Sequence, residues 1–280
     1  MDLSAAYRHC RRVAFGHYEN FPVATVLLPQ PQRDAIAAIY AFARQADDFS
    51  DEPAFADDRV GRLLDWGSRL DRDPAGHPVF VALADARARW GLPTELLSDL
   101  VQAFLLDCRG QRYPDFESLL GYCRLSANPV GRLVLRVFRL DSAEAVRASD
   151  DICTALQLTN HWQDLASDVQ VRDRWYLPKA DMDRFGVTVA QIRRGLWSEG
   201  LEHLLRLQVE RAEALFVSGQ ALPGRLGGRL GLEVRLTLLG GRRILGKIRR
   251  QGYNTLRARP RLGFADAPGI LWDGLLGRTA

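Results

Sequence analysis

Residues 156–178 read LQLTNHWQDLASDVQVRDRWYLP and repeat polar side chains at the spacing of an α-helix. At about 100° per residue, Gln157, Asn160, Asp164 and Asp168 fall within an arc of roughly 80° on one helix face. Apolar residues surround this face, so we expect the helix to carry its amides and carboxylates inward rather than toward solvent. The stretch therefore predicts a wall of oxygen ligands inside the protein.

A second acidic cluster lies at the end of another expected helix, which begins at Pro31 and runs to about Phe49. Proline suits the first turn of a helix. The stretch RQADDFSDE, which begins at Arg44, places Arg44, Asp47 and Asp51 on one face. A simple Arg–Asp pair on a charged helix end would explain this cluster alone. Together, the two clusters favour a shared site. The helix dipole disfavours carboxylates at the carboxyl end of a helix, so we expect a cation beside them.

Length and composition favour a globular helical protein. The chain has 280 residues, of which 47% are hydrophobic, and this is enough to bury a large core. The sequence has no linker rich in Ser, Gly or Pro, no repeat of fixed period and no low-complexity block. Strand signals are nearly absent. We therefore expect one all-α domain over residues 1–280.

Basic residues are concentrated in the last quarter of the chain. Between Pro223 and Arg261 there are eleven Arg or Lys residues against a single acidic residue, Glu233, although the net charge of the whole chain is only +4. Such asymmetry indicates an anionic partner, which could be nucleic acid, a membrane surface or a phosphorylated substrate. No base-reading motif accompanies the arginines, so nucleic acid is not expected.

The four cysteines are widely separated and show no zinc-like spacing with histidine, so we expect reduced thiols in a cytoplasmic protein. The first residues lack the basic-then-apolar pattern of a signal peptide. No run of about 18 apolar residues is present to span a bilayer. The expected location is the cytoplasm, in solution or peripheral at the inner face of the membrane.

Two carboxylate faces without His or Cys ligands suit Mg²⁺, which prefers oxygen ligands and often completes its shell with phosphate oxygens. A diphosphate is then the economical ligand, with arginines and His17 as contacts for its outer oxygens. A glycosidase would isolate one acid and one base instead of repeating carboxylates along helices. A di-iron bundle would need Glu-x-x-His, which the sequence lacks. The remaining chemistry is ionisation of an allylic diphosphate.

These stretches resemble the two aspartate-rich motifs of the squalene/phytoene synthase family. RQADDFSDE matches the first motif, QLTNHWQDLASD at residues 157–168 matches the second, and DRWYLP at residues 173–178 matches the segment that follows it. NFPV at residues 20–23 and SANPVG at residues 126–131 are similar to the branch that makes hydroxysqualene in bacterial hopanoid synthesis.

The chain also departs from the family pattern near Tyr122. Many members carry a second aromatic residue shortly after Tyr-Cys, where this chain has Arg124 and Leu125, and Ser-Ala-Asn replaces Val-Ala-Gly. These departures bear on the catalytic tyrosine of the family.

The resemblance implies a single-domain, all-α isoprenoid synthase fold whose central cavity is lined by two aspartate-rich helices. It implies a site made of metal ligands, substrate contacts and catalytic groups. The implied Mg²⁺ ligands are Asp47, Asp51, Asn160, Asp164 and Asp168; the implied diphosphate contacts are His17, Arg44, Gln157, Asn160 and Arg259; the implied catalytic groups are the four aspartates and Tyr122.

The implied reaction is Mg²⁺-dependent ionisation of presqualene diphosphate, followed by carbocation rearrangement and capture of water to give hydroxysqualene. No glycine-rich nicotinamide fingerprint is present, so water is the simpler terminator. Tyr122, Ser126 and Asn128, near a helix interrupted at Pro129, are candidates to hold that water.

One alternative is condensation of two prenyl diphosphates to presqualene diphosphate or phytoene. Another is a catalytically silent assembly factor with the same fold.

The basic stretch is expected to have two roles. The resemblance implies that Arg259 lies near the cavity mouth, and the other arginines, with Leu and Ile of a basic helix over residues 230–252, would form a membrane-facing surface. The alternative is that these arginines only keep the surface solvated. Contact with neighbouring enzymes of squalene or hopanoid synthesis is also expected.

Overall fold

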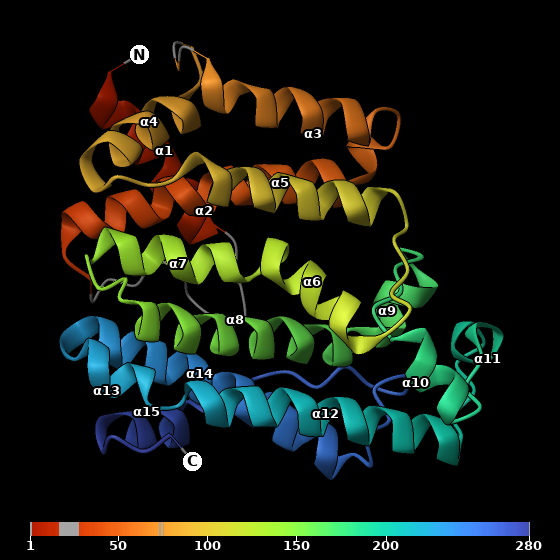
Figure 1. Cartoon of the computed structure of the whole chain (residues 1–280). Coiled ribbons are helices and arrows are strands. Elements are labelled where there is room, and N and C mark those ends of the chain that lie inside the picture. Colours follow the sequence, from red (N-terminus) through yellow and green to blue (C-terminus); the bar gives the residue numbers. More distant parts are fainter. Residues whose placement is uncertain (1, 17–27, 73, 75, 280) are drawn as a thin grey trace. The chain divides into compact units, whose positions relative to one another are not determined.

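The structure, a computed structural model, describes residues 2–16, 28–72, 74 and 76–279. Within these residues all regular elements are helices and no strand occurs, which confirms the all-α prediction (Figure 1). The chain divides into two compact units, each built from two segments. The first comprises Met1–Arg109 and Pro129–Val146, and the second comprises Gly110–Asn128 and Arg147–Ala280. The expectation of a single domain stays a prediction.

The first unit is a set of helices packed around α2. It contains α1 (Leu3–Gly16), α2 (Gln30–Asp51), α3 (Arg59–Ser68), α4 (Pro78–Trp90) and α5 (Thr94–Cys108), two short 3₁₀ turns (Pro53–Phe55 and Arg69–Asp71), most of α7 (Asn128–Val137) and the first residues of α8 (Ala143–Gln163). Helices α1, α3, α4 and α5 all contact α2.

The composition of α2 explains its central position. Pro31 lies in its first turn, as expected, and the helix ends two residues beyond the predicted Phe49. Small buried residues such as Ala38 and Ala41 let the neighbouring helices approach closely. The ring of Phe42 is fully buried against Trp66 and Phe80, with ring centroids 5.7 and 6.0 Å away. This packing fixes the helix that carries the first acidic cluster.

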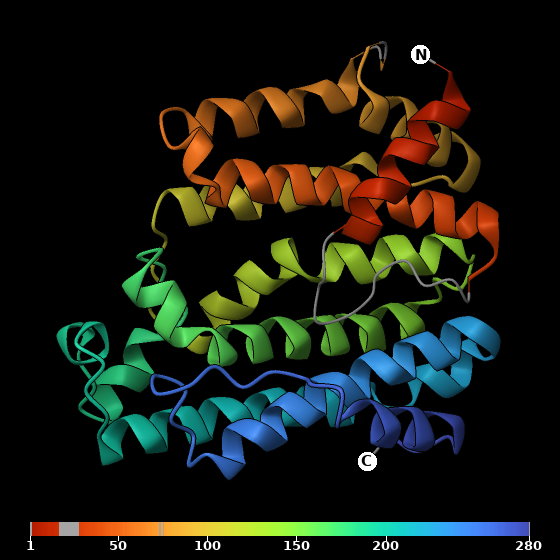
Figure 2. The ribbon, with the colours of Figure 1, turned by 180° about the vertical axis from the view of Figure 1, so that it is seen from behind.

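The second unit holds the remaining helices. They are α6 (Phe116–Ser126), most of α8, α9 (Leu165–Gln170), α10 (Lys179–Arg184), α11 (Val189–Arg193), α12 (Glu199–Gly219), α13 (Leu222–Leu226), α14 (Gly228–Arg250) and α15 (Ala267–Leu275). Helix α14 packs against α12, α13 and α15. Figure 2 shows the segment after α14 returning past α9 before it reaches α15.

Close packing in the second unit depends on Gly241 in the middle of α14. A Cβ atom at this position would lie 2.5 Å from a ring carbon of Phe216 on α12 and 2.8 Å from the side chain of Leu156 on α8. Only glycine therefore allows these three helices to approach as they do.

The basic helix α14 contributes its apolar residues to the core. Leu238, Leu239, Ile244, Leu245 and Ile248 are all buried. The prediction that Leu and Ile of this helix form a membrane-facing surface is therefore wrong. The amphipathic pattern of α14 results from packing within the unit, since a helix that covers a core shows the same periodicity as one that lies on a membrane. Among the described residues, no helix combines the length and the apolarity needed to cross a bilayer.

Candidate active site

The second acidic motif lies where α8 ends and α9 begins. The backbone departs from helical geometry at Asp164, which has φ −100° and ψ 8°. The prediction of one uninterrupted helix through this motif is therefore wrong. The N–H of Asp164 still donates to the Asn160 carbonyl at 2.8 Å, and the N–H of Asp168 donates to the Asp164 carbonyl at 2.9 Å. These i to i−4 bonds keep the polar residues close to their predicted register.

The polar stripe of this motif is turned away from open solvent. Asp168 is buried, with 6% of its surface exposed, and Gln157, Asn160 and Asp164 are half-buried. Trp162 on the same helix is completely buried. The expectation that this helix carries its polar face inward is confirmed.

Arg259 binds the carboxylate of Asp164 through two hydrogen bonds. Its Nη2 donates to Oδ2 at 2.9 Å, and its Nε donates to Oδ1. The Asp164 hydrogen bond raises the pKa of Arg259 above its ordinary value. The next residue is also held, because Nε2 of Gln163 donates to the carbonyl of Pro260 at 2.7 Å. A segment almost one hundred residues away along the chain is therefore attached to the acidic motif.

Asp168 is a buried carboxyl group that pairs with Arg172, whose Nη1 donates to Oδ1 at 3.1 Å. Burial, and then the negative charge of Asp164, raise the pKa of Asp168 to about 7, while Arg172 and Arg174 act in the opposite direction. The carbonyl of Asp168 accepts the N–H of Arg174 at 2.8 Å. The site therefore combines an acid that is costly to ionise with nearby guanidinium groups.

The donor set of this motif fits a hard divalent cation. Oδ1 of Asn160 is buried and has no hydrogen-bond partner among the described residues. A cation would satisfy that oxygen and would also favour the ionised form of Asp168. No group of three or more His, Cys, Asp or Glu side chains in the described part of the chain is arranged to hold a metal ion by itself. Magnesium commonly takes few protein ligands and retains water or substrate oxygens.

The first acidic cluster lies at the end of α2, in the first unit. Nη1 of Arg44 is 3.1 Å from Oδ2 of Asp47, and its Nη2 is 2.7 Å from Oδ1 of Asp48. Arg44 thus binds two adjacent carboxylates, whereas the sequence pattern placed it with Asp47 and Asp51. The helix ends at Asp51, and the N–H of Glu52 caps it on the Asp48 carbonyl at 2.9 Å.

A cluster of buried aromatic rings packs around His161 of the second motif. The rings of His161 and Tyr176 stack with centroids 3.6 Å apart, and Tyr122 contacts both, with centroid distances of 5.9 and 5.4 Å. Burial, assisted by the charge of Arg174, lowers the pKa of His161 to about 3. The imidazole is therefore neutral near pH 7, and its Nε2 lies 3.4 Å from Nε2 of Gln157.

The helix interruption expected at Pro129 occurs at Ala127, between α6 and α7. Oδ1 of Asn128 accepts a hydrogen bond from Oγ1 of Thr154 at 2.9 Å, so this buried oxygen has a structural partner. Oγ of Ser126 is buried and has no hydrogen-bond partner among the described residues. Ser126, one of the three residues expected to hold a water, therefore has a buried hydroxyl group that a water could satisfy.

The structure gathers part of the predicted site within each unit. In the second unit, Arg259 and Asp164 form an ion pair, Asp164 and Asp168 interact electrostatically, and Gln157 and Tyr122 both contact His161. In the first unit, Arg44 and Asp47 are paired and Asp51 ends the same helix. His17 and the NFPV stretch lie outside the described residues.

Sequence reasoning missed several residues at this site, among them Arg172, His161 and Tyr176. Tyr176 and Arg174 belong to the DRWYLP stretch, which was noted only for its resemblance. The sequence of this stretch could have indicated them, because arginine and aromatic residues follow an acidic helix after a short turn. That turn includes Asp173, whose φ of 52° lies in the left-handed region.

Comparison with known proteins places this arrangement in a family. The squalene/phytoene synthase family model matches residues 15–266. A hydroxysqualene synthase of Zymomonas mobilis is 36% identical over 224 residues, which cover 78% of this chain and 75% of that protein. A 15-cis-phytoene synthase of Synechococcus elongatus is 30% identical over 274 residues, covering 92% and 88% of the two chains.

A solved structure, the squalene synthase HpnC from Alicyclobacillus acidocaldarius, superimposes with a TM-score of 0.83 at 42% identity and covers 90% of this chain and 96% of that one. The chain belongs to the squalene/phytoene synthase family. The predicted isoprenoid synthase fold is confirmed, as is the prediction of an enzyme of the prenyl diphosphate-using synthase class.

Proposed function

We propose that this chain is a hydroxysqualene synthase, which converts presqualene diphosphate and water to hydroxysqualene and diphosphate. The observation that carries the proposal is the buried Asp168 beside the Asp164–Arg259 pair, in a chain 36% identical to a hydroxysqualene synthase over 224 residues. Carboxylates and a guanidinium at one place can bind a metal ion and a diphosphate together.

We assign the residues of both acidic motifs to this reaction. Asp47, Asp51, Asn160, Asp164 and Asp168 would hold Mg²⁺, and Arg44, Gln157, Asn160, Arg259 and His17 would contact the diphosphate. Bound Mg²⁺ would supply neutralisation of the charge that develops on the departing diphosphate. Arg259 already neutralises Asp164, and it would exchange this carboxylate for diphosphate oxygens when substrate binds.

Departure of the diphosphate breaks a carbon–oxygen bond and leaves a carbocation in the hydrocarbon chain. The faces of Tyr122 and Tyr176, together with neutral His161, would stabilise that cation without offering a strong base. After rearrangement, the oxygen of one water bonds to the cation and the proton passes to the departed diphosphate. Ser126 would position that water, with the hydroxyl group of Tyr122 as its second contact. The surrounding apolar side chains would keep other water away.

A second candidate reaction is condensation of two prenyl diphosphates. It is favoured by the similarity to the Synechococcus elongatus phytoene synthase, which spans 92% of the chain, a larger share than the 78% covered by the Zymomonas mobilis relative. The same acidic groups would serve both reactions, because each begins with departure of diphosphate from carbon to leave a stabilised carbocation.

Product analysis distinguishes the two reactions. Purified protein with Mg²⁺ is incubated separately with presqualene diphosphate, farnesyl diphosphate and geranylgeranyl diphosphate. Formation of hydroxysqualene from presqualene diphosphate alone supports the proposal. Presqualene diphosphate formed from farnesyl diphosphate, or phytoene formed from geranylgeranyl diphosphate, assigns the chain to condensation.

Removal of the metal should strongly reduce turnover. Treatment with excess chelator is expected to reduce the rate at least about a hundredfold, because the charge on the leaving diphosphate would lose several kcal/mol of stabilisation. Addition of Mg²⁺ above the chelator concentration should restore the rate. An unchanged rate in chelator would show that the acidic motifs do not act through a divalent cation.

We also propose that the enzyme works in the cytoplasm, peripheral at the inner face of the membrane. Its substrate and product would both carry long hydrocarbon chains, which partition into lipid. Contact with neighbouring enzymes of squalene or hopanoid synthesis would allow direct transfer of these poorly soluble molecules.

A further inference from the structure

The last described helix, α15, exposes an unusual concentration of large apolar side chains. Leu271, Trp272, Leu275 and Leu276 are between 50% and 72% exposed, and Phe264, shortly before the helix, is fully exposed. The spacing of these four residues places them on one face of the helix and the turn that follows it. Isolated exposed apolar residues are ordinary on protein surfaces, but four on one helix face, with Trp among them and an exposed Phe shortly before the helix, indicate a binding surface.

The opposite face of α15 is attached firmly to α14. Gly274 is buried, and a Cβ at this position would lie 2.6 Å from the side chain of Leu236 on α14. Nζ of Lys247 donates to Oδ2 of Asp266 at 2.6 Å and to the carbonyl of Arg261 at 2.8 Å, which fixes the approach to α15. The apolar face is therefore held outward by packing on its other side.

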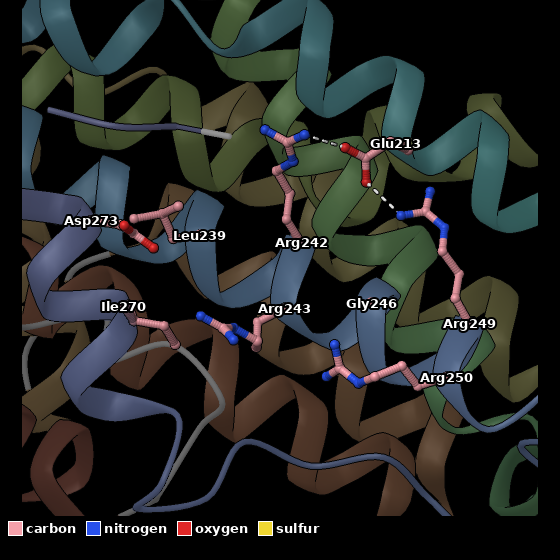
Figure 3. A pocket seen from close by; sticks show the side chains of 9 residues that line it. All are labelled: Glu213, Leu239, Arg242, Arg243, Gly246, Arg249, Arg250, Ile270 and Asp273. Atoms are coloured by element: carbon pink, nitrogen blue, oxygen red, sulfur yellow. Dashed lines mark ion pairs between the residues drawn. The ribbon is translucent and has the colours of Figure 1, made fainter.

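A basic pocket of about 270 Å³ lies beside this helix (Figure 3). Four arginines, namely Arg242, Arg243, Arg249 and Arg250, line it together with the two carboxylates Glu213 and Asp273, so that cations exceed anions by two. Ile270 and Asp273 of α15 also line the pocket. These residues adjoin Leu271 and Trp272 in sequence, and the pocket therefore borders the apolar face.

Two of the four arginines pair with Glu213, and Arg243 acts on another carboxylate, since its charge helps to lower the pKa of Asp266. Glu213 forms ion pairs with Arg242 at 2.6 Å and with Arg249 at 3.6 Å, and Figure 3 shows both guanidinium groups turned toward it. Arg243 and Arg250 form no hydrogen bond or ion pair within 4 Å in the described part of the chain. In Figure 3, the guanidinium group of Arg243 extends toward Ile270 of α15.

We propose that Phe264, the exposed face of α15 and the pocket arginines Arg243 and Arg250 form the surface that docks on an anionic lipid bilayer. Leucine and aromatic side chains enter the boundary between headgroups and acyl chains, while neighbouring arginines bind lipid phosphates. Tryptophan is enriched at this depth of the bilayer. The proposal gives the membrane association under Proposed function a defined surface, but it does not depend on which diphosphate reacts.

A second copy of the chain fits this surface less well. Five apolar side chains are few beside the roughly 20–30 residues that each partner contributes to a stable interface. A symmetric contact would also bring the unpaired Arg243 and Arg250 of two copies toward each other, and such repulsion disfavours association. An anionic bilayer instead complements both the apolar face and its basic border.

Vesicle sedimentation of the full chain tests the proposal. We expect binding to phosphatidylcholine vesicles that contain phosphatidylglycerol, and weaker binding to phosphatidylcholine alone. A Trp272→Ser/Leu275→Ser variant should bind at least about tenfold more weakly, because it lacks two apolar side chains that would enter the bilayer. Leu196→Ser is the matched control, since Leu196 is 52% exposed elsewhere in the same unit.

An Arg243→Gln/Arg250→Gln variant isolates the charged part of the surface. It should lose about fivefold in affinity per arginine for the anionic vesicles, little affinity for neutral vesicles, and much of its salt dependence. Arg194→Gln serves as the charge control. Brominated lipids should quench less of the total tryptophan fluorescence in Trp272→Phe than in the original chain, which would place this residue in the bilayer.

Every variant is also assayed with detergent-dispersed substrate, where the original rate is expected because none of the changed residues belongs to the active site. This arm separates failure of docking from failure of the proposed function. Absence of vesicle binding by the original chain would overturn the proposal, as would binding of the apolar variant equal to that of Leu196→Ser. A self-associated species in sedimentation velocity that Trp272→Ser/Leu275→Ser dissolves would assign the surface to a second copy.

Discussion

Replacement of Asp164 with asparagine should lower kcat by at least about a hundredfold, because several kcal/mol of stabilisation of the departing diphosphate would be lost. The amide cannot provide the negative charge that attracts a divalent cation. Its similar size leaves the backbone at the junction of α8 and α9 undisturbed, since the Asp164 side chain makes no capping hydrogen bond there. Steady-state kinetics and far-UV circular dichroism together measure both effects.

Asp168→Asn and Asp51→Asn should show losses of the same order, because each would remove one of the proposed metal ligands. Asp183→Asn is the matched control, since Asp183 is an exposed carboxylate that pairs with Lys179 on α10. Its variant should keep the original kcat. Turnover of Asp164→Asn or Asp51→Asn at the level of this control would remove the assignment of the acidic motifs to catalysis.

Truncation of Phe42 to alanine should destabilise the protein by about 3–5 kcal/mol, the range measured for fully buried aromatic residues. The ring fills the space between α2, Trp66 and Phe80, and the Phe42 carbonyl accepts the indole N–H of Trp66 at 3.2 Å. Urea unfolding followed by circular dichroism measures the change. Leu64→Ala on α3, where Leu64 is 53% exposed, should cost far less.

The position of Phe42 on α2 links this stability to function. Arg44 and Asp47 follow within two turns of the same helix, and their orientation depends on how its apolar face packs. We therefore expect Phe42→Ala to raise KM and lower kcat at temperatures where the variant remains folded. A folded Phe42→Ala variant with unchanged stability would show that this aromatic cluster does not determine the position of α2.

Local sequence patterns were sufficient for much of the fold. The helix of Pro31 and Phe42 was expected from its apolar period and its initial proline, and the structure has it within two residues of the predicted end. The break between α6 and α7 was expected from Pro129 and the small residues around it. Both features follow from local conformational preferences, which a sequence displays directly.

Other features depend on residues that are distant in the chain. The departure from helical geometry at Asp164 accompanies the attachment of Gln163 to Pro260 and of Asp164 to Arg259, and no periodicity within residues 156–178 could reveal it. The apolar residues of α14 were interpreted wrongly as a membrane-facing surface. Their spacing fits a membrane surface and a protein core equally well, and only packing with α12 and α15 decides between them.

The acidic stripe itself was predictable because helical spacing alone brings its members to one face. The aromatic group beside it was harder to predict, since Tyr176 lies beyond a turn at Asp173 whose course the sequence does not specify. Burial and the charge of Asp164 raise the pKa of Asp168 against the effect of Arg172, and burial with the charge of Arg174 lowers the pKa of His161.

In the proposed reaction, water captures the cation that presqualene diphosphate leaves. The most direct measurement is an incubation of purified protein with presqualene diphosphate and Mg²⁺ in ¹⁸O-labelled water, without any reductant, followed by mass spectrometry of the lipid extract. We expect hydroxysqualene that carries one ¹⁸O atom in its hydroxyl group. Squalene that forms only when reduced nicotinamide is added, or an alcohol without the label, would contradict it.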